Sequence, residues 1–180
     1  MYSRPRSDSG IPWIGKVPNG WTIEKLKWVT TKRMEQVSPD DLPEYVIHYS
    51  IPNVQEFGTG VRERSEDIQS SKQVVSPGDV IFSKLNPRKG TLTTVRTPES
   101  DEDVLVGSGE FIRMEPNGIE GSFLRYIVSE DGFVSRIDSM VESVTRSHQR
   151  VTPDTFLSQL VPLPTLPEQR DIVSFLDEKT

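Results

Sequence analysis

The sequence predicts one mixed α/β (α+β) domain that is rich in β-structure in its middle and has short helices toward its C-terminal end. Three observations lead to this class. Apolar residues alternate with a period of two near Ile47, proline and glycine turns recur between residues 76 and 118, and the apolar period becomes helical after Gly121. A chain of 180 residues suits one sizeable domain.

The predicted strands occupy residues 45–118. A half-buried strand is indicated between Pro43 and Pro52 by the alternating residues Tyr45, Ile47, Tyr49 and Ile51. The segment Ser76-Pro77-Gly78-Asp79 is typical of a turn, here between strands at 74–75 and 80–82. After a second turn at 86–90, we expect further short strands at 92–95 and 111–114.

Helices are predicted after Gly121. Ser122 is the expected N-cap of the first helix and Gly132 its expected end, with a second short helix over 133–141. The segment Thr165-Leu166-Pro167-Glu168 fits a capping box, which starts a final helix. That helix carries an apolar stripe that no second local helix covers, made of Ile172, Val173 and Leu176.

Composition excludes several classes of protein. The chain has no cysteine, so it forms no disulfide or thiolate metal site, and a reducing compartment such as the cytoplasm is expected. No apolar run reaches the ~18–20 residues of a membrane span, and the N-terminus has no apolar signal core.

Charge is segregated along the chain, although the net charge is −6. Residues 80–98 contain four basic residues and no acid, and residues 143–153 are also free of acid. By contrast, residues 99–103 contain four carboxylates in five positions. Solvated faces of a soluble protein are an equally good interpretation of any one of these runs.

Catalytic and metal sites are not indicated. His48 and His148 are the two histidines, and they lie 100 positions apart, without the spacing of metal ligands on one helix face. The carboxylates of 99–103 form a self-repelling run with no apolar pocket to raise a pKa. We find neither a phosphate loop around Gly107-Ser108-Gly109 nor a nucleophile elbow.

Three stretches together resemble the specificity subunits of type I restriction–modification systems. The first is Ile11-Pro12-Trp13-Ile14-Gly15 with Pro18-Asn19-Gly20-Trp21, similar to the family's opening motif. The second, residues 78–87, is similar to a strand and loop of the family's target-recognition domain. The third and most specific, Val161-Pro162-Leu163-Pro164-Thr165-Leu166-Pro167-Glu168-Gln169-Arg170, is similar to the lead into the family's long conserved helix.

The resemblance implies a non-catalytic DNA-specificity subunit. It assigns residues 1–164 to a target-recognition domain and 165–180 to the start of the conserved helix, so the chain looks like a half-length or truncated subunit. The implied partners are double-stranded DNA, a methyltransferase subunit, a restriction/translocase subunit and a second copy of the chain through the C-terminal helix. No cofactor is expected on this chain, because S-adenosylmethionine, ATP and Mg belong to the partner subunits.

The acid-free stretches supply the candidate DNA-binding residues, since phosphates would meet cations there without repulsion. We expect Lys84, Arg88 and Lys89 to contact mainly phosphates and Asn86 to reach a base edge. The second stretch has the donors for base readout. The full candidate set is Ser83, Lys84, Asn86, Arg88, Lys89, Arg146, Ser147, His148, Gln149 and Arg150.

Two functions stay open at this point. The stripe of Ile172, Val173 and Leu176 is the expected partner-binding seam, with packing inside the domain as its alternative. The favoured function is sequence-specific DNA recognition, and the alternative is an interaction module that only docks to partner subunits. Salt separates the two, because only a DNA reader loses affinity steeply as salt rises.

Overall fold

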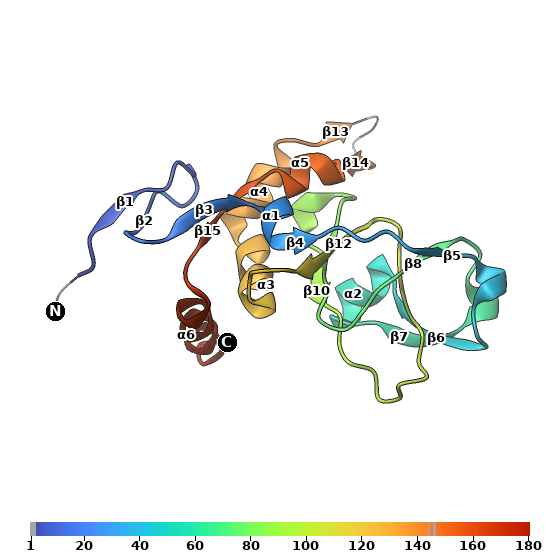
Figure 1. The fold of residues 1–180 in the computed structure, drawn as a ribbon. Helices are drawn as coiled ribbons and strands as arrows, with labels where there is room; N and C mark the ends of the chain where they lie inside the picture. The colour runs from blue at the N-terminus through green and yellow to red at the C-terminus, as the bar shows by residue number, and fades with distance from the viewer. Residues whose placement is uncertain (1–2, 144, 146) are drawn as a thin grey trace.

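Two larger sheets and three two-stranded pairs contain the strands of the part of the chain that the structure describes (Figure 1). The structure is a computed structural model and describes residues 3–143, 145 and 147–180. The mixed α+β class predicted from the sequence is confirmed: strands dominate the middle of the chain, and a helix ends it.

The four-stranded sheet is antiparallel and has the order β10-β9-β12-β4. Its strands are β4 (Thr30–Thr31), β9 (Val80–Ser83), β10 (Leu92–Thr94) and β12 (Phe111–Pro116). Val80 and Phe82 of β9 face the main core, whereas Ile81 faces a second apolar cluster. The run of three apolar residues is therefore buried on both sides of this sheet.

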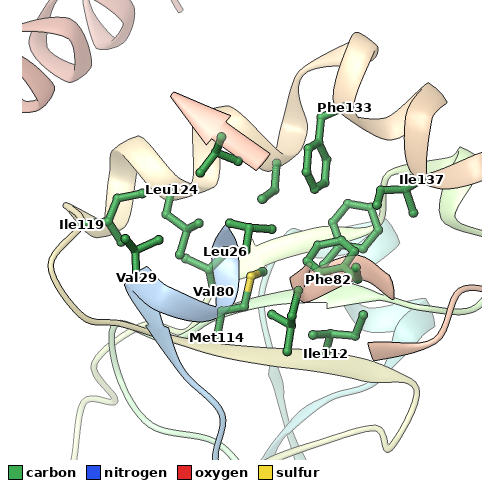
Figure 2. Packing of buried hydrophobic residues seen from close by; sticks show 14 of the residues in the cluster. Leu26, Val29, Val80, Phe82, Ile112, Met114, Ile119, Leu124, Phe133 and Ile137 are labelled. Atoms are coloured by element: carbon green, nitrogen blue, oxygen red, sulfur yellow. The ribbon is translucent and has the colours of Figure 1, made fainter. Parts of the chain in front are cut away.

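Short helices supply the other half of the main core, as Figure 2 shows. The centroid of the Phe156 ring lies 4.9 Å from that of Phe82 and 5.4 Å from that of Phe133. Such aromatic pairs add ~0.5–1.5 kcal/mol beyond the area they bury. The helices are α1 (Leu26–Val29), α3 (Gly121–Ser129), α4 (Asp131–Asp138) and α5 (Pro153–Leu157).

The five-stranded sheet has the order β5-β8-β11-β6-β7, and only β11 and β6 run parallel in it. Its strands are β5 (Gln36–Val37), β6 (Tyr45–Tyr49), β7 (Val61–Arg64), β8 (Lys72–Val74) and β11 (Leu105–Gly107). The short 3-10 turns η1 (Pro39–Asp41) and η2 (Ser65–Asp67) flank them.

The predicted strand at 45–51 is confirmed only as far as Tyr49. Ile51 instead begins α2 (Ile51–Phe57), because the Ser50 side chain accepts a hydrogen bond from the Asn53 amide and caps the helix. Pro52 lies in the first turn of α2, where its missing amide hydrogen costs nothing. The proline expected to stop a strand thus helps to start a helix.

The turn at 76–79 carries the chain from one larger sheet to the other, because β8 and β9 belong to different sheets. Asp79 is almost fully buried there, and its carboxylate accepts from the Ser76 amide at 2.8 Å and from Nε of Arg113 at 2.5 Å. Arg113 also donates to the Val74 carbonyl and the Ser76 hydroxyl. The side chain of a β12 residue therefore fixes the crossing between the sheets.

The predicted ends of α3 are wrong. Glu120, not Ser122, caps it, since the Glu120 carboxylate accepts from the Phe123 amide at 2.9 Å. Gly132 lies inside α4 and ends no helix. Trp13 packs there so closely that a Cβ on Gly132 would come within 2.8 Å of Trp13 Cβ, which accounts for glycine at this position.

The two ends of the chain meet in a sheet that the sequence did not predict. β3 (Thr22–Lys25) pairs antiparallel with β15 (Leu160–Leu163), whereas β1 (Arg6–Asp8) and β2 (Lys16–Pro18) form a hairpin that extends away from the body (Figure 1). Arg4 and Glu168 form an ion pair that also joins the two ends.

The final helix, α6 (Leu166–Asp177), begins with the predicted capping box of Thr165 and Glu168. It packs on α3: Gln169 is buried, and its Oε1 accepts from the Glu120 amide at 2.8 Å. Ile172 and Val173 pack against the main core, which is the arrangement given above as the alternative to a partner seam. Within the described residues, no helix combines the length and the apolar character needed to cross a membrane.

Replacing Arg113 with methionine should lower the free energy of unfolding by roughly 3–5 kcal/mol, because Asp79 would stay buried without its partner. Urea denaturation followed by tryptophan fluorescence measures this loss. The double variant Arg113→Met/Asp79→Asn should recover much of it, since the charge is removed while the acceptor for the Ser76 amide is kept. A single-variant loss below ~1 kcal/mol would contradict the role of the pair.

Candidate nucleic-acid interface

The structure brings the two acid-free stretches together. β13 (Glu142–Ser143) and β14 (Gln149–Arg150) form a hairpin whose second strand lies against the segment that follows β9. The Asn86 amide donates to the Gln149 carbonyl at 2.7 Å, and the Val151 amide donates to the Lys84 carbonyl at 3.0 Å. We call the surface formed by residues 84–89 and 147–150 the junction face.

Asn86 holds the two halves of the junction face in place. Its backbone is left-handed, with φ of 48°, and among the described residues it is the one non-glycine with positive φ. Asparagine tolerates this conformation better than most residues. Its side-chain amide donates to the Ser147 carbonyl at 3.2 Å, and the turn η3 (Pro87–Lys89) follows directly. The Asn86 side chain, which was expected to reach a base edge, thus joins the two acid-free stretches.

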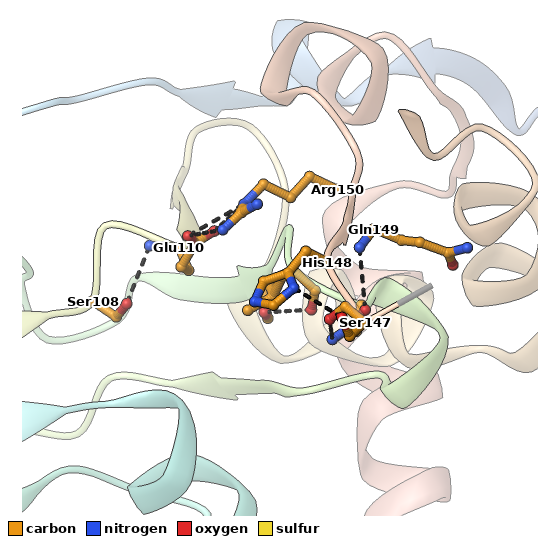
Figure 3. A network of polar contacts seen from close by, with 9 residues as sticks. Ser108, Glu110, Ser147, His148, Gln149 and Arg150 are labelled. Carbon is orange, nitrogen blue, oxygen red and sulfur yellow. Dashed lines mark hydrogen bonds and ion pairs between the residues drawn. The ribbon is translucent and has the colours of Figure 1, made fainter. Parts of the chain in front are cut away.

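Arg150 is held by Glu110 on the β12 side of the junction face (Figure 3). Its guanidinium donates to the Glu110 carboxylate from Nη2 at 2.8 Å and from Nε at 3.1 Å. The hydrogen bond from Arg150 lowers the pKa of Glu110. Glu110 was missed in the sequence because it lies outside both acid-free stretches, and only the fold places it beside Arg150.

The other candidate residues differ in how accessible they are. Ser83 is buried, and its hydroxyl donates to the Leu85 carbonyl, so it does not reach the surface in this structure. Arg88 and Lys89 are exposed, and Nη1 of Arg88 donates to Oε1 of Gln149 at 3.0 Å. Lys84 is half-buried.

Ser147 and His148 complete the described part of the junction face. Both side chains are exposed, and the Ser147 hydroxyl lies 3.0 Å from Nδ1 of His148. Arg146, also a candidate, lies outside the described residues. The acidic run at 99–103 lies elsewhere, in the yellow-green loop at the bottom of Figure 1, whereas the β13–β14 hairpin lies at the top.

Comparison with solved structures identifies the fold. The HsdS subunit from Thermoanaerobacter tengcongensis is similar with a TM-score of 0.73 and 24% identity, over 90% of this chain and 42% of that one. A chain from a structure on complex assembly and conformational transition of the type I R-M system is similar with a TM-score of 0.71 and 25% identity, over 90% and 42%. No protein-family model and no curated protein matches the sequence.

The chain therefore shares the fold of an HsdS subunit and of a chain from a type I R-M system, the family whose motifs the sequence resembles. The chain has the fold of a single recognition domain of such a subunit, and it spans less than half the length of each similar chain.

Replacing Arg150 with glutamine should raise the pKa of Glu110 back toward its ordinary value of 4.5, which an NMR titration of the carboxyl carbon measures. A lowered pKa means that the pair stabilises the fold above pH 4.5 and loses this effect as pH falls through the lowered value. The wild type should therefore lose ~0.5 kcal/mol more than Arg150→Gln on acidification. Arg62→Gln, which removes the distant pair with Asp103, is the control and should leave Glu110 unchanged.

Proposed function

We propose that this chain reads double-stranded DNA as the specificity subunit, or half subunit, of a type I restriction–modification complex. The observation that carries the proposal is the junction face, where two acid-free stretches about sixty residues apart form one surface. By binding its target site, the chain would direct methylation and restriction by partner subunits. This chain would contribute no chemistry, and S-adenosylmethionine, ATP and Mg would be bound by those partners.

The residues of the junction face divide by chemistry. Lys84 and Lys89 suit phosphates, which fix the register of the protein on DNA without reading sequence. Gln149 and His148 suit base edges in the major groove, where a good bidentate contact discriminates by ~1–3 kcal/mol. Because Oε1 of Gln149 already accepts from Arg88, these two side chains would approach the DNA as one unit.

A single recognition domain would read one part of a two-part site. We propose that the second part is read by another copy of the chain, since two copies related by a two-fold axis place two equal faces on the duplex. Contact through α6 would use Leu176 together with the exposed Phe175, because Ile172 and Val173 pack inside the domain. The methyltransferase and translocase subunits are the other proposed partners. Light scattering that found only monomer, with and without DNA, would exclude the paired arrangement.

A titration with a random duplex pool at two salt concentrations, with and without a methyltransferase subunit, tests the function. Sequencing of the retained DNA should reveal a short motif. Gln149→Ala should relax the preference at one base pair by ~1–3 kcal/mol, whereas Lys89→Gln should weaken all sequences alike and reduce the salt slope by about 1. If no DNA were retained while the methyltransferase subunit bound tightly, the chain would be an interaction module instead.

A further inference from the structure

A cleft of about 160 Å³ lies beside the junction face and is lined by segments far apart in sequence. Lys32 and Met34 come from the connection between β4 and β5, Lys72 from β8, and Lys84 from the junction face itself. Phe111 of β12 and Leu157 of α5 add apolar surface. The fold, and no local motif, assembles this site.

The charged side chains that line the cleft are all cationic. None of the described residues that line it is a carboxylate. In the described part of the chain, Lys72 and Lys84 have no carboxylate within 4.0 Å, and Lys72 donates only to the Ser70 hydroxyl. Lys32 lies 3.9 Å from Asp154, but both side chains are exposed, so this pair is weak.

Two further cations in the lining, both arginines, already form ion pairs with carboxylates. Arg113 is bound to Asp79, and Arg33 forms an ion pair with Glu115, with its Nε 2.8 Å from a carboxylate oxygen. The three lysines that remain, Lys32, Lys72 and Lys84, line the cleft together with the apolar residues Met34, Phe111, Ile112 and Leu157. This combination fits a sugar–phosphate backbone, whose phosphates are anionic and whose deoxyribose rings are largely apolar.

We infer that the DNA contact continues from the junction face into this cleft. Lys84 contacts one phosphate, and Lys32 and Lys72 bind neighbouring phosphates of the same DNA strand. The inference rests on the proposed function and adds residues that the sequence did not single out. Lys72 lies on β8 and Lys32 in the β4–β5 connection, outside the two stretches 80–98 and 143–153, so only their position beside Lys84 connects them to DNA.

The test compares the double variant Lys32→Gln/Lys72→Gln with the control Arg6→Gln/Lys16→Gln. Both remove two positive charges, but Arg6 and Lys16 lie in the projecting β1–β2 hairpin, at the other end of the molecule from β8 (Figure 1). Binding of a labelled random-sequence duplex is measured by fluorescence anisotropy over a series of salt concentrations. Phosphate contacts do not depend on sequence, so no target site is needed.

The cleft double variant should bind about tenfold more weakly at low salt and lower the slope of log affinity against log salt by about 2, near 0.9 for each lost contact. The control should behave as the wild type. If the wild type binds and both double variants match it, the cleft inference is wrong while the proposed function stands. If the wild type binds no duplex at any salt concentration, the proposed function fails and the inference fails with it.

Discussion

The buried pair of Asp79 and Arg113 is the constraint on which the arrangement of the two larger sheets depends. It lies where the chain passes from β8 to β9, and both side chains are at most 4% exposed. A buried ion pair adds little net stability, but a partner left alone is costly. The pair therefore acts chiefly by excluding other arrangements: β12 can hold the turn only in the register that brings Arg113 to Asp79.

That register also places the candidate site. β9 pairs with β12 through Ser83 and Phe111, so the Lys84 amide reaches the Glu110 carbonyl one step beyond the ladder. The β13–β14 hairpin then adds to this edge. A rigid pair of strands thus supports a surface made of loops, which is how binding residues are commonly presented. Arg150 and Glu110 connect the hairpin to the rigid part.

A net charge of −6 is compatible with DNA binding because the charges are unevenly distributed. Glu110, Glu115 and Asp79 are each paired with an arginine, so their charge is neutralised locally. The acidic run at 99–103 lies away from the junction face, and Asp103 there pairs with Arg62. The acid-free stretches and the acidic run, which are separate in the sequence, are therefore also separate in space.

The sequence by itself determined what depends on near neighbours: the capping box of Thr165 and Glu168, the apolar run of β9, and the two stretches without acids. These features follow from contacts within a few residues. It could not place Ile51 in a helix, bury Ser83, or pack Ile172 and Val173 against the main core. Those outcomes, like the pairing of Arg150 with Glu110 and the cleft that contains Lys32 and Lys72, were decided by the tertiary structure. The physical reason is that sheet register and core packing depend on contacts made along the whole chain. The chemistry of neighbouring residues does not specify which distant segments meet.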